Sequence, residues 1–394
     1  MTHKLHNWIR NKILKNVENY YITTHNYSFK HKDIEIKLCY PLKTDILSTK
    51  NLIFGKTFSD HMLDINWTEK NGWGTPKILP YKNLTINPAV KALHYAIQLF
   101  DGLKAYRGID NKIRLFRPQL NIQRILKGTE RLALPVKSFD PSEFLECIKT
   151  LVNIEKNWVP RPDSNLLNSL YIRPTYLGTE PTLGVASSTS AQLYVITSPV
   201  GSYYANGSDS IALYTDARYV RAWPGGVGDI KLGSNYAPTV YLQKKACENG
   251  CQQVLWLYGP DRQITEVGTM NTFMLWENCD GKLELITAPL NGLILPGITR
   301  LSILELARSW KEFEVSEKVY TMGDLLLGIK ENRVKEFFGT GTAVVITPVH
   351  QIMYEGVRYE IPTTKGTNPL YTRLFKALMD IHSGKVASPW TCEI

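Results

Sequence analysis

Short strand-like runs alternate with helix-like runs along this chain at irregular spacing, and this pattern restricts the fold more than any other feature of the sequence. The regular βαβ period that a doubly wound parallel sheet requires is missing. We expect strands at 113–116, 192–197, 253–258, 271–276 and 283–287, and helices at 121–132, 141–155, 235–249 and 299–310. The pattern therefore predicts an α+β fold.

The length and composition predict two domains. A chain of 394 residues that is 43% hydrophobic holds enough apolar material for more than one core. Turn-forming residues cluster at Pro199, Gly201 and Gly207, after a strand-like run. We place a smaller N-terminal α/β domain at 33–190 and a larger C-terminal α/β domain at 191–394.

Half of the net charge of +10 lies in the first 32 residues, where six basic residues and one acid leave +5. In a helix, the apolar residues of this leader would gather on one side and most basic residues would lie elsewhere, as in a mitochondrial presequence. The alternative is the basic tail of a cytosolic protein. The remaining body is only mildly basic, so we expect no nucleic-acid partner. Because no apolar run approaches the roughly 18 residues of a membrane-spanning helix, we expect no membrane partner.

The segment 221–236 contains a single lysine, Lys231, among four glycines. Glycines allow the backbone to approach a ligand closely, and a lysine amine in such a site can attack a carbonyl group. Taken alone, the segment is better explained as an ordinary loop lysine among turn glycines.

Further segments supply what a pyridoxal cofactor needs. Glu266 offers a carboxylate that would keep a pyridine nitrogen protonated. The run 294–300 places Pro296 and Gly297 before a helix, whose first N–H groups suit a phosphate. The glycine-rich turn at 339–343 offers backbone donors to a carboxylate. Together these segments favour a cofactor-binding lysine.

Over about 54–362 the chain resembles the fold-type-IV pyridoxal-phosphate enzymes, and specifically the branched-chain aminotransferases of the animal type. The resemblance is strongest at 54–62, 94–102, 114–118 and 254–259. It implies a two-domain fold with the cofactor site at the domain interface.

The resemblance implies roles for individual residues around pyridoxal 5′-phosphate. Lys231 would carry the cofactor as a Schiff base and move the proton between the substrate and the cofactor. Glu266 would pair with the ring nitrogen, Tyr236 with the ring oxygen and Arg124 with the phosphate. The remaining cofactor-binding positions would be Thr269, Leu295, Gly297, Ile298, Thr299 and Thr342.

The resemblance also implies a substrate site and no metal. The α-carboxylate would bind the backbone of Thr342 and Ala343 and the Tyr95 hydroxyl, while Arg173 would hold the distal carboxylate of glutamate. The apolar side chain would be enclosed by Phe54, Tyr171, Tyr203 and Val185. Val185 would reach across the interface of a homodimer.

We therefore expect a ping-pong transamination of L-leucine, L-isoleucine and L-valine with 2-oxoglutarate, giving branched-chain 2-oxo acids and L-glutamate. A mitochondrial location is expected, with the cytoplasm as the alternative. The rival enzymes on the same fold are a D-amino-acid aminotransferase and an aminodeoxychorismate lyase. A rival from another class is an inactive nucleic-acid-binding protein that uses the basic leader.

Overall fold

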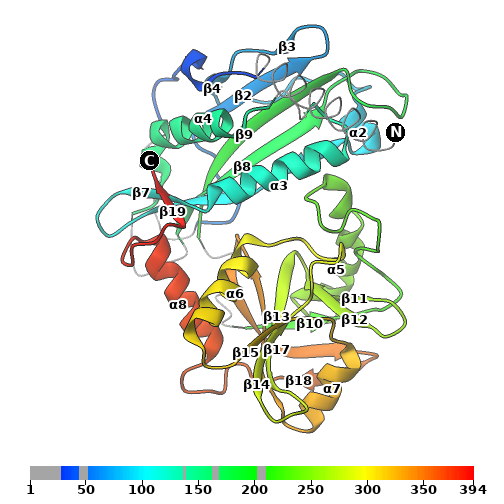
Figure 1. The fold of residues 1–394 in the computed structure, drawn as a ribbon. Helices are drawn as coiled ribbons and strands as arrows, with labels where there is room; N and C mark the ends of the chain where they lie inside the picture. Colours follow the sequence, from blue (N-terminus) through cyan, green and yellow to red (C-terminus); the bar gives the residue numbers. More distant parts are fainter. Residues whose placement is uncertain (1–27, 44–51, 136–138, 162–167, 202–209) are drawn as a thin grey trace, which may run out of the picture.

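The computed structural model describes residues 28–43, 52–135, 139–161, 168–201 and 210–394, and these form two β-sheets with helices packed on them. Figure 1 shows the sheet from the first half of the chain above the sheet from the second half, with the helix α3 at the level where the two parts meet. The predicted α+β class is confirmed.

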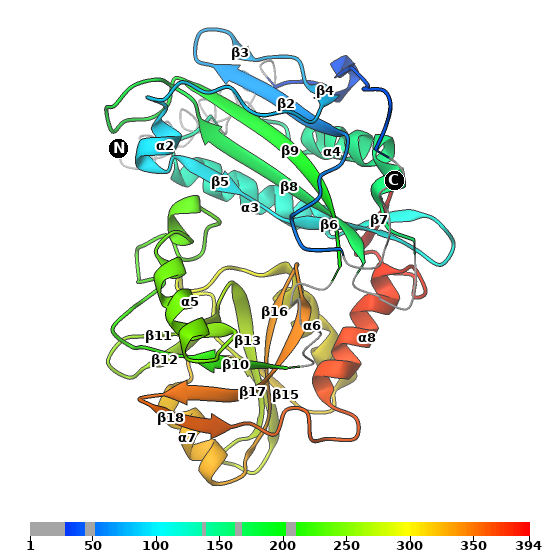
Figure 2. The ribbon, with the colours of Figure 1, turned by 180° about the vertical axis from the view of Figure 1, so that it is seen from behind.

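The first sheet has ten strands in the order β1-β4-β2-β9-β8-β6-β7-β19, with β3 paired to β2 and β5 paired to β8. The chain returns to this sheet at its end, because the last strand pairs antiparallel with β7 (Figure 2). The strands are β1 Glu35–Ile36, β2 His61–Thr68, β3 Gly72–Trp73, β4 Lys77–Pro80, β5 Gln98–Phe100, β6 Leu103–Arg107, β7 Ile113–Phe116, β8 Ser169–Gly178, β9 Ser190–Val200 and β19 Thr391–Glu393.

The second sheet has nine strands in the order β12-β11-β10-β17-β16-β13-β14-β15, with β18 paired to β17. An additional pairing of β12 with β13 closes part of this sheet into a ring. The strands are β10 Ile211–Tyr214, β11 Gln253–Tyr258, β12 Gln263–Val267, β13 Met270–Glu277, β14 Leu283–Thr287, β15 Glu314–Glu317, β16 Val334–Gly341, β17 Val345–Tyr354 and β18 Val357–Glu360.

The helices begin where the sequence provides capping residues. Asp140 caps α4 by accepting hydrogen bonds from the N–H groups of Ser142 and Glu143, and Pro141 occupies the first turn. The helices are α2 Lys91–Tyr95, α3 Pro118–Arg131, α4 Pro141–Ile154, α5 Thr239–Glu248, α6 Ile298–Trp310, α7 Met322–Lys330 and α8 Leu370–His382, with short 3-10 helices η2 His31–Asp33, η4 Lys156–Trp158 and η5 Gly233–Asn235.

Two predicted boundaries differ from the structure. The helix expected from residue 235 begins at Thr239, because η5 and Pro238 precede it. The division at 190/191 would cut β9 from the first sheet, where β9 pairs with β2 and β8, so the change from one sheet to the other follows Val200. The division of the chain into two domains stays a prediction.

The two sheets are joined by a shared apolar cluster. Tyr106 of β6 is buried together with Phe338 of β16 and Leu374 of α8. The first sheet has a separate core against α3 and α4. The shared cluster fixes the first sheet against the second and so determines the shape of the space between them.

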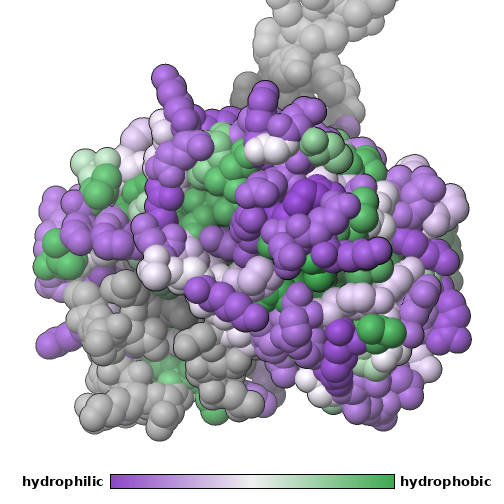
Figure 3. All heavy atoms as spheres, turned by 90° about the horizontal axis from the view of Figure 1, so that it is seen from below, coloured by the Kyte–Doolittle hydropathy of each residue, from purple (hydrophilic) through white to green (hydrophobic). Residues whose placement is uncertain are grey.

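Seen from below in Figure 3, the described surface of the molecule is predominantly hydrophilic, with hydrophobic residues in separate areas. Among the described residues, every helix is too short or too polar to cross a membrane.

Candidate active site

Close packing between the two halves of the chain fixes the backbone around Lys231. The Lys231 carbonyl accepts a hydrogen bond from the N–H of Phe100 at 3.0 Å, so β5 holds this residue in place. A Cβ atom on Gly233 would lie 2.6 Å from the side-chain nitrogen of Gln98, so any larger residue here would displace the Gln98 side chain.

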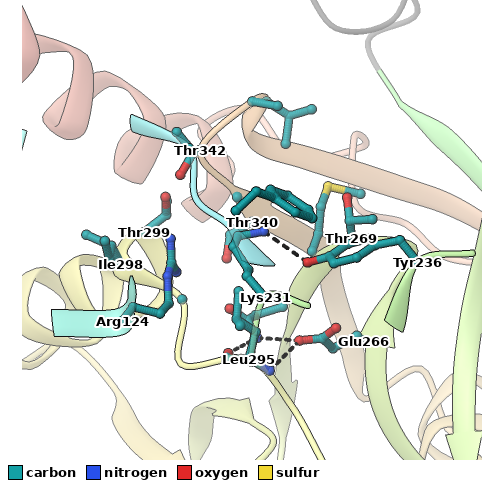
Figure 4. Close-up of a pocket in the computed structure, with 18 of the residues that line it drawn as sticks. Arg124, Lys231, Tyr236, Glu266, Thr269, Leu295, Ile298, Thr299, Thr340 and Thr342 are labelled. Carbon is teal, nitrogen blue, oxygen red and sulfur yellow. Dashed lines mark hydrogen bonds between the residues drawn. The ribbon is translucent and has the colours of Figure 1, made fainter. Parts of the chain in front are cut away.

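The Lys231 amine lies beside two neighbouring aromatic rings. Nζ donates a hydrogen bond to the Tyr236 hydroxyl at 3.0 Å. It also lies 5.1 Å from the ring centre of Phe100 and 5.3 Å from that of Tyr236. Figure 4 shows Lys231 reaching into the middle of the pocket, with Tyr236 and Glu266 on one side of it and Arg124 on the other.

Glu266 is a buried carboxylate held by three donors. Oε1 accepts from the N–H of Leu295 at 2.8 Å and from the side chain of Asn271 at 3.1 Å. Oε2 pairs with Nε of Arg221 at 2.9 Å. Burial raises the pKa of Glu266, while Arg221 and the Leu295 N–H act against that rise. The carboxylate is thus fixed in orientation and has a buried cation beside it.

Arg124 of α3 is held by a buried carboxylate. Asp101 accepts from Nε at 2.7 Å and from Nη2 at 2.6 Å, and the remaining terminal nitrogen donates to the Pro296 carbonyl at 3.4 Å. Burial alone would raise the pKa of Asp101, but Arg124 and the Asn121 side chain outweigh burial and lower it. The bidentate pair fixes the plane of the guanidinium group beside the start of α6.

The start of α6 and the turn after β16 complete this side of the pocket. Gly297 is the N-cap of α6, so the N–H groups of the first turn are free to bind an anion. A Cβ atom on Gly297 would lie 2.0 Å from the Asn271 amide oxygen. Figure 4 shows Thr299 and Thr342 close to Arg124. Thr340 has a buried hydroxyl oxygen without a hydrogen-bond partner among the described residues.

Aromatic side chains form another wall of the pocket. The rings of Phe54 and Tyr171 pack edge to face, with their centres 4.9 Å apart. The Arg173 guanidinium donates to the Tyr171 hydroxyl at 2.9 Å and lies 4.6 Å from the ring centre of Phe100. This wall combines apolar surface with one cation.

These groups line one cavity of about 210 Å³ between the two sheets. Fourteen of the predicted residues line it, namely Phe54, Arg124, Tyr171, Arg173, Lys231, Tyr236, Glu266, Thr269, Leu295, Gly297, Ile298, Thr299, Thr342 and Ala343. The structure therefore brings together most of the predicted site.

Two predicted substrate residues, Tyr95 and Val185, do not line this cavity. Tyr95 is 37% exposed, and its hydroxyl donates to the Leu183 carbonyl. Within its own chain Tyr95 does not reach the cavity, because α2 and the loop before β9 hold it at the surface. Val185 is 81% exposed, so a substrate-binding role for either residue requires a second chain. Tyr203 lies outside the described residues.

Several lining or supporting residues were not predicted. Arg221 and Asp101 were part of the motifs but received no role, and Asn271 and Thr340 were also missed. The only available signal was the position of Arg221 and Asp101 inside motifs rich in site residues. No periodicity indicates that a buried arginine pairs with Glu266.

The donors in the cavity fit a phosphorylated pyridine aldehyde. One end offers Arg124, free helix N–H groups and small hydroxyl side chains for a dianion. The Lys231 amine lies near the middle of the cavity, and the Glu266 carboxylate lies on the side of Lys231 away from Arg124 (Figure 4). The distribution of charge therefore matches pyridoxal 5′-phosphate.

Comparison with known proteins agrees with this geometry. The Amino-transferase class IV family model matches residues 98–352. The mitochondrial branched-chain-amino-acid aminotransferase of Mus musculus is 51% identical over 363 residues, covering 92% of this chain and 91% of that protein. The cytosolic enzyme of Rattus norvegicus is 50% identical over 372 residues, covering 93% and 88%.

Solved structures show the same fold. The branched-chain aminotransferase of Thermoproteus uzoniensis with norvaline has a TM-score of 0.67 at 19% identity, covering 84% of this chain and 99% of that one. The branched-chain amino acid aminotransferase of Thermobaculum terrenum in its PLP form has a TM-score of 0.66 at 20% identity, covering 85% and 98%. The chain belongs to the class IV aminotransferases and, within them, to the family of branched-chain-amino-acid aminotransferases.

Proposed function

We propose that this protein transfers the amino group of L-leucine, L-isoleucine or L-valine to 2-oxoglutarate by a ping-pong mechanism that uses pyridoxal 5′-phosphate. The observation that carries the proposal is the Lys231 amine in a cavity with Glu266 on one side and Arg124 on the other. Relatives that are 51% and 50% identical to this chain in sequence are named branched-chain-amino-acid aminotransferases. The comparisons do not favour the rival enzymes on this fold.

Arg124, the first N–H groups of α6 and Thr342 would bind the cofactor phosphate. Tyr236 would hold the ring oxygen, and Glu266, fixed by Arg221, would keep the ring nitrogen protonated. When bound, pyridoxal 5′-phosphate supplies an electron sink for the bond broken at the substrate Cα.

Lys231 would act as the general base and acid. Its Nζ atom would accept the proton from the substrate Cα and donate it to the cofactor carbon that carries the amino nitrogen. The Tyr236 hydroxyl, 3.0 Å from Nζ, keeps this amine in position.

The two substrates would share one site. The apolar rings of Phe54 and Tyr171 suit the side chains of leucine, isoleucine and valine. Arg173, at the edge of the same wall, would bind the distal carboxylate of glutamate or 2-oxoglutarate.

We further propose a homodimer, since Val185 and Tyr95 are exposed outside the cavity of their own chain and would act on the site of a second chain. A mitochondrial location also stays a proposal. Relatives named mitochondrial and cytosolic are equally similar, and most of the leader lies outside the described residues. Size-exclusion chromatography with light scattering and cell fractionation test these two points.

The decisive experiment is the absorbance spectrum of the purified protein before and after addition of L-leucine. We expect a visible band from the cofactor attached to Lys231, which L-leucine removes and 2-oxoglutarate restores. A panel with D-alanine and 4-amino-4-deoxychorismate separates the rivals. A protein without the band when supplied with cofactor, or one that responds to D-alanine alone, would contradict the proposal.

A further inference from the structure

Lys104 is a buried lysine that the proposed mechanism does not use. It lies in β6 of the first sheet, is 2% exposed, and has no carboxylate within ion-pair distance among the described residues. Its Nζ atom donates to the carbonyl oxygen of Ala343 at 2.8 Å, in the turn between β16 and β17. A buried cation without a carboxylate partner is costly, so this contact calls for an explanation.

The turn that receives this hydrogen bond is strained. Val345, the residue that ends the turn, has a φ of +62°, in the left-handed region. A β-branched residue adopts this conformation only when the surrounding structure imposes it, and such residues cluster at ligand-binding positions. Val345 is also 2% exposed and packs in the cluster shared by the two sheets.

A small cavity of about 20 Å³ lies behind the turn. Lys104, Thr342, Val345 and His382 line it together with Thr299 of the predicted phosphate site. His382 stacks on Tyr106 at 4.4 Å, and burial, followed by the charge of Lys104, lowers the pKa of His382 to about 3. A neutral imidazole therefore leaves Lys104 as the nearby source of positive charge.

On these observations we propose that Lys104 is a positioning residue, whose hydrogen bond to the Ala343 carbonyl holds the turn 341–345 in the strained conformation that binds the substrate carboxylate. The inference rests on the proposed function, because it assumes that Thr342 and Ala343 face that carboxylate. Both line the main cavity, and Thr342 lines the small one as well. The Lys104 amine, when protonated, also favours an anion bound at this turn.

The test compares Lys104→Met, which removes the donor and the charge, with Lys104→Gln, which keeps a donor. Lys104→Met should raise the KM of both L-leucine and 2-oxoglutarate about 10-fold with kcat nearly unchanged, since a hydrogen bond that supports binding in both states is lost. Lys104→Gln should lie between wild type and Lys104→Met. Lys112→Met, which removes an exposed lysine near the same sheet, should behave as wild type.

A second readout is independent of turnover. Calorimetry of the cofactor-loaded protein with 4-methylpentanoate, a carboxylate without an amino group, should give a dissociation constant about 10-fold weaker in Lys104→Met. Cofactor absorbance and thermal unfolding of each variant show whether the protein is folded and loaded.

The role of the strained turn is tested with Val345→Gly, since glycine adopts a positive φ without strain. If Lys104 holds the turn, its loss should raise KM less in the Val345→Gly background than in wild type. A loaded Lys104→Met protein with KM and dissociation constant within two-fold of wild type would overturn the proposal. So would a fall in kcat and cofactor content with KM unchanged, which indicates a merely structural role. An inactive wild type that still binds 4-methylpentanoate more tightly than Lys104→Met would instead refute the proposed function alone.

Discussion

Replacing Asp101 by asparagine tests how the anion-binding end of the cavity is held. Asp101 is fully buried and accepts two hydrogen bonds from Arg124, one from Asn121 and one from the N–H of Gly102. Asparagine has the same shape but no charge, and its amide group offers only one acceptor oxygen. In Asp101→Asn the buried Arg124 therefore keeps its charge and loses its bidentate partner.

The expected magnitude follows from the burial of both groups. Removing one member of a buried ion pair costs about 3–5 kcal/mol. The melting temperature of a domain of about 150–250 residues falls by about 2–4 °C for each kcal/mol of lost stability. The cofactor-free variant should therefore melt roughly 6–20 °C below wild type. A bound phosphate would supply a new counter-charge to Arg124, so pyridoxal 5′-phosphate should stabilise the variant more than it stabilises wild type.

Differential scanning fluorimetry of both proteins, without ligand and with pyridoxal 5′-phosphate, measures this difference. Pyridoxal lacks the phosphate and should stabilise the two proteins equally. Glu305→Gln is the matched control, because Glu305 pairs with Arg117 at 2.9 Å at a more exposed position and should cost about 1 kcal/mol or less. Equal stabilisation of Asp101→Asn and wild type by pyridoxal 5′-phosphate would refute the assignment of Arg124 to the phosphate.

Three further predictions concern single residues of the cavity and its surroundings. Lys231→Ala should bind pyridoxal 5′-phosphate without the band of the lysine-bound cofactor and should lose at least about 1000-fold in kcat, measured by spectrum and coupled assay. Gly102→Ala would place a Cβ atom 1.9 Å from the Tyr171 hydroxyl, so it should raise the KM of L-leucine by at least about 10-fold while cofactor absorbance persists. Burial lowers the pKa of Lys104 to about 7, so the folded protein loses this proton at lower pH than the unfolded chain, whose value is 10.5. Wild type should therefore gain stability relative to Lys104→Met, by up to about 4 kcal/mol, as the pH rises from about 7 to about 10. Urea unfolding at several pH values measures this difference. If the free energies of unfolding of the two proteins change in parallel with pH, the lowered pKa is wrong.

The fold and the chemistry were predictable to different depths. The helical patterns at 141–155 and 299–310, the second preceded by Pro296 and Gly297, predicted α4 and α6 because these signals act locally. The sheet order could not be predicted, since the return of residues 391–393 to the first sheet depends on contacts with β7, which is far away along the chain. The boundary after Val200 was missed for the same reason, because β9 is assigned by its partners rather than by its own residues.

Within the site, motif position located residues but not their partners. Arg124 and Glu266 were predicted, yet the residues that orient them, Asp101 and Arg221, were recognised only from the structure. A pair that joins a strand end to a helix leaves no periodic trace in the sequence. The position of Tyr95 outside the cavity of its own chain depends on the loop at Leu183, whose path the sequence does not indicate.

Two charged groups of the cavity, Arg124 and Glu266, share an arrangement that Lys104 beside it lacks. Arg124 and Glu266 each have a buried partner of opposite charge, which favours the charged form of each group against the cost of burial. Such pairing orients the group at little electrostatic cost and leaves its free edge for the ligand. Lys104 alone among these three has a carbonyl oxygen in place of a carboxylate, and it therefore stands to gain most from an anion bound at the turn. An anionic substrate would then supply the counter-charge that the protein itself does not, which couples occupation of the site to the stability of the turn that forms it.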